Sequence, residues 1–247
     1  MYAIIGGSGL AKLSALDRPR RMVMRTPYGE PSGALTFGHL AGQEVVFLAR
    51  HGYGHTIAPH DINYRANIWV LKDLKVEGVV AVATVGGIRD DIGPGALVLP
   101  HQIIDYTHGR KATFFEGPDV PVTHVDFTQP YAERLRADLL RAARSCGEPV
   151  IDGAVYACTQ GPRLETAAEI ERLARDGGEI VGMTGMPEAV LAREAGLDYA
   201  TLGAVVNHAA GRGTSKNQIK LDELEAVMRA TVVRAVRILE ALLGGAP

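Results

Sequence analysis

Gly78-Val-Val-Ala-Val-Ala-Thr-Val-Gly-Gly87 is an apolar run that ends in two glycines. A continuous run of small and β-branched apolar residues is typical of a strand covered on both faces of a largely parallel sheet. Outward from it, further strands are expected at 2–5, 34–49 (a hairpin), 96–99, 102–106, 153–158, 179–181 and 199–206. Helices are expected at 62–74, 131–146, after Glu165 to about 175, 187–195 and 221–243. This order predicts one α/β domain, residues 1–247, with a mixed central β-sheet flanked by helices.

Local signals refine three of these boundaries and one long connection. Asp61 is the expected N-cap of the 62–74 helix, and Pro187 suits the first position of the 187–195 helix. The basic run Arg18 to Arg21 is expected to be a solvated loop. The polar segment 107–128 is long and irregular, which indicates a functional segment or an interface.

Composition excludes several classes of protein. The formal net charge of −2 gives no electrostatic reason to expect a nucleic-acid partner. No apolar run reaches the roughly 18 residues of a membrane span, and no signal peptide is recognised at the N-terminus. The only cysteines, Cys146 and Cys158, lack metal-ligand spacing. We therefore expect a cytoplasmic protein without a metal site.

A glycine turn, Gly6-Gly-Ser-Gly9, follows the first strand and can bring backbone amides close to an anion. A dinucleotide-binding fingerprint that begins at Gly7 fails because Lys12 stands where a glycine is needed. A nucleophile elbow that begins at Gly6 fails at Leu10 for the same reason. Taken alone, this turn is equally compatible with having no ligand.

Polar groups recur where the expected strands end. These groups are Ser8, Arg50 with His51, Thr84, Thr184, Asn207 and, after a sixth strand, Glu165. Strand ends in a partly parallel sheet converge, and open α/β sheets bind ligands there. The hydroxyls and the arginine fork suit a phosphate, whereas a carboxylate and an amide can read the edge of a heterocycle.

Five motifs carry a resemblance to a known family. They are Ile4-Ile-Gly-Gly-Ser-Gly9, Ala49-Arg-His-Gly52, Asn63-Tyr-Arg-Ala-Asn-Ile-Trp69, Gly161-Pro-Arg163 and Met183-Thr-Gly-Met-Pro-Glu188. Together they closely resemble the trimeric purine nucleoside phosphorylase and methylthioadenosine phosphorylase family, over nearly the whole chain. The resemblance implies a homotrimer with sites near subunit interfaces. It also implies a purine nucleoside as substrate, inorganic phosphate as co-substrate, and no metal or organic cofactor.

The resemblance also implies roles for individual residues. Phosphate would be held by Ser8, Arg50, His51, Ala83, Thr84 and Thr184, with backbone contacts the safer expectation at Ala83 and Thr84. Met183 would lie along the ribose, Leu164 takes the place of an aromatic residue that packs on the base, and His124 would reach into the neighbouring subunit's site. Asn207 and Glu165 are the expected catalytic residues, with His208 and Ala209 beside Asn207 in the substrate site.

Departures from the family pattern bear on the substrate. Methylthioadenosine phosphorylases carry aspartates at the positions of Asn207 and Ala209 and a serine at that of Glu165, so this chain follows the pattern of enzymes for 6-oxopurines. The chemistry agrees, because Glu165 can accept from N1–H while Asn207 donates to O6. Ile219 and Leu221 instead match apolar positions that hold a methylthio group. The substrate that combines a 6-oxopurine base with a methylthio group on the sugar is 5′-methylthioinosine.

Three alternatives stay open at this point. The chain could be an inosine or guanosine phosphorylase, or a methylthioadenosine phosphorylase with unusual site residues. From a different class, it could be a nucleoside-binding protein without catalysis. The retained phosphate residues Ser8, Arg50 and Thr184 argue against the last of these.

Overall fold

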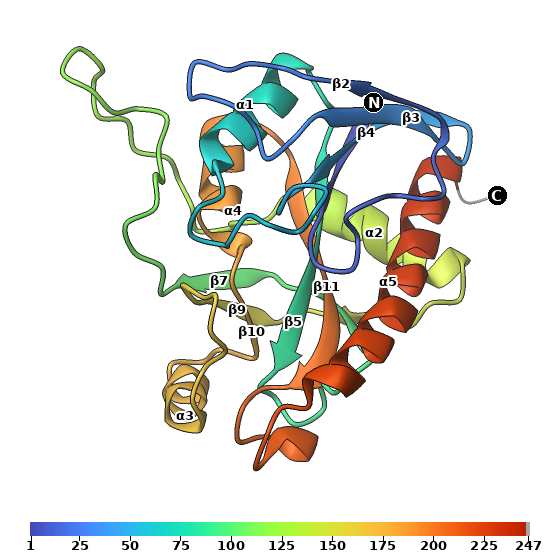
Figure 1. The fold of residues 1–247 in the computed structure, drawn as a ribbon, viewed down its shortest axis with the longest axis vertical. Coiled ribbons are helices and arrows are strands. Elements are labelled where there is room, and N and C mark those ends of the chain that lie inside the picture. The colour runs from blue at the N-terminus through green and yellow to red at the C-terminus, as the bar shows by residue number, and fades with distance from the viewer. Residues whose placement is uncertain (246–247) are drawn as a thin grey trace.

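The structure, a computed structural model, describes residues 1–245 and is built around strand β5 (Val79–Gly87). Along one edge, β5 pairs in parallel with β11 (Tyr199–His208) over its whole length. Its other edge is shared: β1 (Tyr2–Gly6) pairs in parallel with residues 79–82, and β10 (Ile180–Gly182) pairs antiparallel with Gly86 and Gly87. The apolar run 78–87 is therefore the centre of the sheet (Figure 1).

Within residues 1–245 the sheet has 11 strands, and its main path runs β2-β3-β4-β1-β5-β10-β9-β7. The remaining strands are β2 (Asp17–Met22), β3 (Leu35–Leu40), β4 (Gln43–Ala49), β6 (Leu97–Leu99), β7 (Gln102–Asp105), β8 (Ile151–Asp152) and β9 (Val155–Cys158). Parallel and antiparallel pairs occur together, because β1–β4 and β9–β10 are parallel whereas β2–β3 and β3–β4 are antiparallel. The expected mixed central sheet is confirmed.

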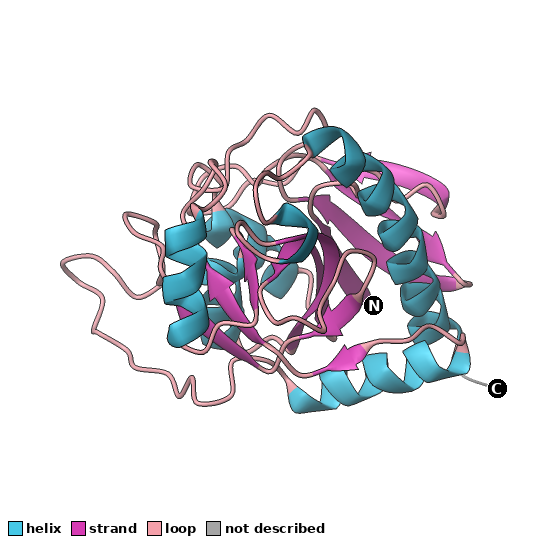
Figure 2. Ribbon diagram, turned by 90° about the horizontal axis from the view of Figure 1, so that it is seen from below, coloured by secondary structure: helices cyan, strands magenta, loops and turns pink. Residues whose placement is uncertain are grey.

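Helices cover both faces of this sheet (Figure 2). They are α1 (Tyr64–Asp73), α2 (Glu133–Ser145), α3 (Ala167–Arg175), α4 (Gly185–Glu194) and α5 (Leu221–Gly244). Helices α2 and α5 contribute to one buried apolar cluster with the sheet, and α1 and α4 contribute to another. The α/β fold class is therefore confirmed. No helix within residues 1–245 combines the length and apolarity that crossing a bilayer requires.

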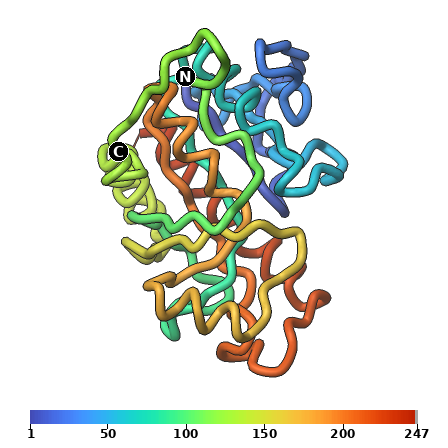
Figure 3. Tube along the Cα trace, turned by 90° about the vertical axis from the view of Figure 1, so that its left-hand side faces the viewer, coloured from blue at the N-terminus to red at the C-terminus, as the bar shows by residue number. Residues whose placement is uncertain are grey.

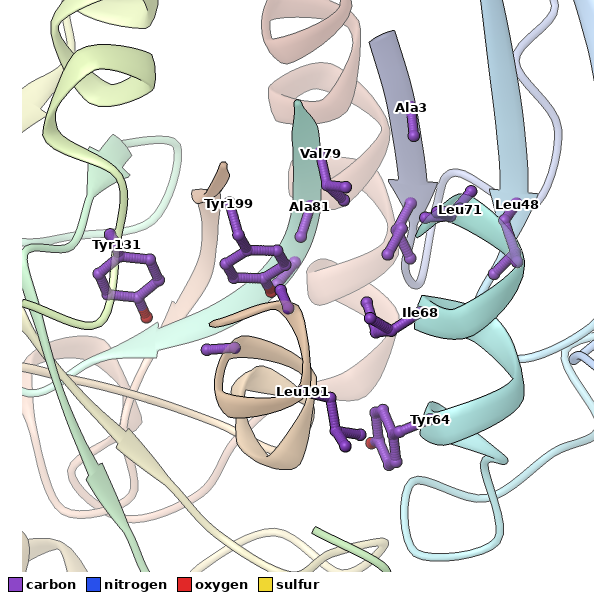
Figure 4. Close-up of a cluster of buried hydrophobic side chains, with 14 of the residues drawn as sticks. Ala3, Leu48, Tyr64, Ile68, Leu71, Val79, Ala81, Tyr131, Leu191 and Tyr199 are labelled. Carbon is purple, nitrogen blue, oxygen red and sulfur yellow. The ribbon is translucent and has the colours of Figure 1, made fainter. Parts of the chain in front are cut away.

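The cluster under α1 and α4 is drawn in Figure 4. Ile68 and Leu71 of α1 point toward the sheet, where Val79 and Ala81 of β5 lie in the same cluster, and all four side chains are fully buried. Their helical spacing on α1 follows the apolar stripe of the sequence. This packing fixes α1 against β5, and the site described below is built on that strand.

Shortening Leu71 to alanine is expected to lower the free energy of unfolding by about 2–5 kcal/mol, because a fully buried leucine leaves a cavity behind. Val233→Ala on α5 is the matched control. Its side chain is 54% exposed, so a change within about 0.5 kcal/mol is expected. Urea unfolding of both variants measures the difference. Equal losses in the two would contradict the packing described for α1.

Two local expectations are wrong. Arg18 to Arg21 form part of the edge strand β2, which pairs with β3 through backbone hydrogen bonds although every side chain in it is exposed. Its register shifts between Asp17 and Arg20, and an edge strand with such an irregularity tolerates Pro19. Helix α1 begins at Tyr64, and its cap is Asn63, whose Oδ1 accepts from the backbone N–H of Ala66 at 3.1 Å. Asp61 is not the cap.

Two further segments largely agree with the expectations drawn from the sequence. The 107–128 segment has no helix or strand and extends away from the body as a green loop (Figures 1 and 3). Helix α4 is assigned from Gly185, but Met186 and Pro187 have non-helical backbone angles, so its regular turns follow Pro187 rather than start at it.

Candidate active site

A cavity of about 480 Å³ opens at the carboxyl ends of β1, β4, β5 and β11 and is closed by the loops after β9 and β10. It contains most of the residues expected to form a site: Ser8, Arg50, His51, Ala83, Thr84, Leu164, Glu165, Met183, Thr184, Asn207, Ala209 and Ile219. The structure thus brings together residues that are up to 211 positions apart, from Ser8 to Ile219. The roles assigned to them remain predictions.

One end of the cavity lies where β5 changes partners. On that edge the β1 ladder ends at Val82 and the β10 ladder begins at Gly86, so the strand pairing skips Ala83, Thr84 and Val85. These three residues line the cavity, together with Gly7 and Ser8 of the turn after β1. A switch point of this kind, with unpaired backbone beside a glycine turn, is where open α/β sheets take ligands.

Thr184 arrives at the same place by a different route. β10 runs antiparallel to β5, with Val181 opposite Gly86, so the chain that leaves β10 travels back along β5 toward Thr84. Thr184 directly precedes α4, lines the cavity and is buried. Its hydroxyl and the glycine-turn amides therefore lie at the same end of the cavity.

Arg50 provides the positive charge at this end. Its side chain is only 1% exposed. It forms a bidentate ion pair with Glu188, with Nε 2.7 Å from Oε2 and Nη2 2.8 Å from Oε1. Nη1 also donates to the carbonyl of Val82 at 3.2 Å. A guanidinium has five N–H groups, so these bonds leave two for an anion. A Cβ on Gly7 would come within 2.8 Å of Nη1, so glycine is needed beside the guanidinium.

Glu188 was not among the expected site residues. It is fully buried and also accepts a hydrogen bond from the hydroxyl of Tyr199 at 2.8 Å. Burial by itself lowers the pKa of Arg50, but the charge of Glu188 and its hydrogen bonds more than offset this, and the pKa rises above its usual value. Arg50 therefore stays charged. No local sequence pattern reveals this pair, because 138 positions separate its members.

Two histidines line the cavity close to Ser8. His51 is buried, and its Nδ1 lies 2.8 Å from the carbonyl oxygen of Ile57. A carbonyl only accepts, so Nδ1 carries the proton and Nε2 of the neutral ring is an acceptor. The ring of the second, His55, is tilted against that of His51 with 4.6 Å between the ring centroids, and its Nε2 lies 3.4 Å from Ser8 Oγ. His55 is also new. Only its position four residues after His51 could have indicated it.

The state of His51 gives a pH prediction. Burial, followed by the charge of Arg50, lowers the pKa of His51 from 6.5 to about 4. Between pH 4 and 6.5 the unfolded chain then binds more protons at this residue than the folded chain, so its contribution to stability rises with pH across that window. We expect the stability of the wild type relative to His51→Gln to increase from pH 4 to 6.5 and then level off. Urea unfolding across this range measures it, and a pH-independent difference would contradict a neutral His51.

Glu165 and Asn207 also line the cavity. Glu165 Oε1 accepts from Thr159 Oγ1 at 2.6 Å. Thr166, the next residue, caps α3 through a capping box with Glu169, and this fixes the turn that carries Glu165. Asn207 follows a register shift in β11, a feature that redirects side chains near sites. Its Nδ2 donates to the carbonyl of His208 at 2.6 Å, which leaves one N–H and the amide oxygen for a ligand.

Met183 and Leu164 line the cavity from the loops after β10 and β9. A Cβ on Gly161 would come within 2.4 Å of Met183 Sδ, and Gly161 has a positive φ of 64°. Glycine at this position therefore lets Met183 lie flat on the loop after β9. Leu164 lines the cavity but is still 41% exposed, so it borders the mouth.

The third wall is apolar. Ile57, Ile219, Leu224 and Met228 line it, and the last two lie four residues apart on the inner face of α5. Leu221 was expected here, but it is 66% exposed at the first position of α5 and does not line the cavity. Leu224, almost one turn further on, takes that place. The helical spacing of Leu224 and Met228 was the signal that could have identified them.

Two other expected residues lie outside the cavity. His208 Nδ1 is 3.0 Å from Thr214 Oγ1, and its ring packs on Gly213, so it holds the loop that precedes α5. His124 is exposed on the 107–128 segment and does not line the cavity of its own chain. Its expected contact with a neighbouring subunit stays a prediction.

Comparison with known proteins identifies the family. A model described as the phosphorylase superfamily matches residues 1–244, and the chain belongs to that superfamily. The expected membership in the purine nucleoside and methylthioadenosine phosphorylase group is confirmed by the relatives that follow.

Three relatives are informative. A probable S-methyl-5′-thioinosine phosphorylase from Pseudomonas syringae pv. tomato is 54% identical over 229 residues, 93% of this chain and 92% of that protein. A 6-oxopurine nucleoside phosphorylase from Pyrococcus furiosus is 48% identical over 219 residues, 87% of this chain and 82% of that one. The solved structure of methylthioadenosine phosphorylase from Schistosoma mansoni with adenine has a TM-score of 0.92 at 33% identity, and covers 98% of this chain and 90% of its own.

Proposed function

We propose that this enzyme cleaves S-methyl-5′-thioinosine with inorganic phosphate and releases hypoxanthine and 5-methylthioribose 1-phosphate. One observation carries the proposal: a single cavity combines an anion end at Arg50, a base-reading pair of Glu165 and Asn207, and an apolar wall. The name of the 54% identical relative from Pseudomonas syringae pv. tomato supports the same substrate.

The base-reading pair favours a 6-oxopurine. Glu165, already holding Thr159 through one oxygen, can accept from purine N1–H, while the amide of Asn207 donates to O6 and accepts from a protonated N7. A 6-aminopurine offers a lone pair at N1 and donors at the 6-position. It would leave both groups mismatched, which discriminates strongly in a buried site.

The apolar wall favours a methylthio group. Ile219, Leu224 and Met228 can surround a thioether but offer no hydrogen bond to a 5′-hydroxyl. Because the wall belongs to the cavity that also holds the base-reading pair, a nucleoside bound across the cavity would meet both.

The chemistry follows from these positions. Phosphate held by Ser8, Arg50 and Thr184 attacks the anomeric carbon as the bond from that carbon to the purine breaks. The positive charge that develops on the ribose is stabilised by the phosphate itself, and the purine leaves as N7 gains a proton, a form that Asn207 stabilises. Positioning and electrostatics supply the catalysis, with no covalent intermediate on the enzyme.

We further propose that the enzyme needs no metal or organic cofactor, acts in the cytoplasm as a homotrimer, and is one nucleoside phosphorylase domain over residues 1–247. The exposed 107–128 segment, which carries His124 away from its own cavity, supports an arrangement in which it contacts a neighbour. Analytical ultracentrifugation tests the trimer, and a monomer would refute it.

Phosphorolysis assays of methylthioinosine, inosine and methylthioadenosine, each with and without phosphate, test the activity. We expect the highest kcat/KM for methylthioinosine and no turnover of any nucleoside without phosphate. A preference for inosine would favour the second candidate, a 6-oxopurine nucleoside phosphorylase, which the 48% identical relative from Pyrococcus furiosus also supports. Cleavage without phosphate would point to a hydrolase, and binding without cleavage to a nucleoside-binding protein.

A further inference from the structure

We propose that Arg110 is a positioning residue that fixes the loop carrying Glu165 against the loop carrying Thr184. The inference rests on the proposed function for the roles of those two residues. Arg110 belongs to the irregular 107–128 segment and does not itself line the cavity. It lies behind the cavity and contacts backbone from both loops.

The contacts divide between the two loops. On the side of β9, Nη2 donates to the carbonyl of Gln160 at 2.8 Å and to that of Thr159 at 3.4 Å, and Nε donates to the Gln160 side chain at 3.2 Å. On the side of β10, Nη1 donates to the carbonyl of Met183 at 2.9 Å and to that of Met186 at 2.5 Å. One planar group therefore joins the two loops.

Both loops lead directly to site residues. Thr159, whose carbonyl Arg110 contacts, donates from Oγ1 to Glu165 and from its backbone N–H to Gly182, at 2.6 and 2.8 Å. Met183 precedes Thr184, the expected phosphate ligand. A shift of one loop against the other would change the distance between the base-reading carboxylate and the phosphate end.

The hydrogen-bond partners of Arg110 are neutral groups, so the residue joins the two loops rather than forming an ion pair. No carboxylate within residues 1–245 forms a salt bridge with it; its partners are four carbonyls, one amide and the hydroxyl of Tyr64, at 3.2 Å. Only a guanidinium offers five donors in a fixed plane, whereas the ammonium of a lysine offers three from one point. Geometry of this kind is lost when arginine becomes lysine.

The chain offers a matched control in Arg65 of α1. Arg65 also anchors the 107–128 segment, through Nη1 to the carbonyl of Thr113 at 3.5 Å and to Glu116 at 2.5 Å, but it contacts neither active-site loop. Arg65→Gln removes this anchor of the segment and a contact with the ring of Tyr28, while Arg110→Gln removes the contacts with both active-site loops. The comparison separates positioning from general anchoring.

The experiment measures kcat/KM for methylthioinosine and methylthioadenosine, the phosphate KM and thermal unfolding for the wild type, Arg110→Gln, Arg110→Lys and Arg65→Gln. A misplacement of about 1 Å costs on the order of 100-fold, so we expect Arg110→Gln to lower kcat/KM for methylthioinosine by about that factor. The phosphate KM should rise, and the preference for the oxopurine should fall by about 10-fold, because Glu165 no longer faces N1–H squarely. Arg110→Lys should recover only part of the loss, and Arg65→Gln should keep the wild-type ratio.

Unchanged selectivity and phosphate KM in Arg110→Gln would overturn the proposal, as would equal losses in Arg65→Gln. If Arg110→Gln does not fold, the same criteria apply to Arg110→Lys. Failure of the proposed function is seen separately, in the wild type. If the wild type prefers another purine nucleoside, the variant-to-wild-type ratios are measured on that nucleoside and decide the role of Arg110 by the same comparison.

Discussion

Replacing Glu165 by alanine is expected to lower kcat/KM for 6-oxopurine nucleosides by about 10²–10³-fold, comparable with the loss of one preorganised hydrogen bond in an active site. The carboxylate is the one group expected to accept from N1–H. It accepts from Thr159, and the turn that carries it is followed directly by the capping box of α3, so its position is fixed. Steady-state phosphorolysis of methylthioinosine measures the effect.

Glu171→Ala is the control for this variant. Glu171 lies on α3 and pairs with Arg212 at 2.8 Å, but it does not line the cavity. We expect its activity to match the wild type, because an exposed ion pair contributes about 1 kcal/mol or less to stability. A near-normal rate in Glu165→Ala would rule out the role assigned to the carboxylate.

Asn207→Asp provides a second check of the same idea. An aspartate can accept from a 6-amino group but cannot donate to O6, so the ratio of kcat/KM for methylthioadenosine to that for methylthioinosine should rise. Methylthioadenosine phosphorylases carry aspartate at this position in the family pattern. Unchanged selectivity would refute base reading by Asn207, even if the Glu165 variant behaves as expected.

Replacing Glu188 by glutamine is the second substitution with a large expected effect. The neutral amide leaves the guanidinium of Arg50 buried without a counter-charge, and breaking one partner of a buried pair costs about 3–5 kcal/mol of stability. Arg50 also loses its bidentate pairing with a carboxylate, so its guanidinium can rotate. Its free N–H donors then no longer point at the phosphate, and the phosphate KM should rise by about 10-fold or more. Urea unfolding and phosphate titrations of the initial rate measure the two effects.

Asp198→Asn is the matched comparison for Glu188→Gln. Asp198 pairs with Arg134 at 2.8 Å, and both side chains are more than a third exposed. A stability change of about 1 kcal/mol or less and an unchanged phosphate KM are expected. If Glu188→Gln binds phosphate as tightly as the wild type, Arg50 is held in place by something other than this pair.

The arrangement of the cavity was largely predictable from the strand ends. Ser8 and Arg50 follow β1 and β4, and Thr84 lies in the second half of β5; these strands run parallel to one another, so the carboxyl-end rule places the three residues together. Thr184 reaches the same cavity although β10 is antiparallel to β5, because β10 pairs only with the far end of β5 and its chain turns back. Thr184 therefore lies in the cavity as expected, but the rule for the carboxyl ends of parallel strands does not explain its position.

Features that rest on long-range pairing were not predictable. Glu188 sits within a helical pattern and gives no sign that it holds Arg50, 138 positions earlier. Strand β2 has no apolar alternation because its side chains face solvent and only its backbone pairs with β3. Leu221 was expected to line the cavity because it matches an apolar position of the family pattern. Helix α5 does begin at Leu221, as expected, but the side chain of this first residue is exposed and Leu224 lines the cavity instead.

The gap in pairing at residues 83–85 of β5 has a consequence for how such an enzyme can diverge. The anion end of the cavity combines this main chain at the centre of the sheet with the side chain of Arg50, which the buried Glu188 holds in place. In the proposed function, the choice of nucleobase depends on two side chains, Glu165 after β9 and Asn207 near the end of β11. Point mutations at these two positions can redirect the enzyme among nucleosides while phosphorolysis is inherited intact, so substrate range and chemistry can evolve at different rates.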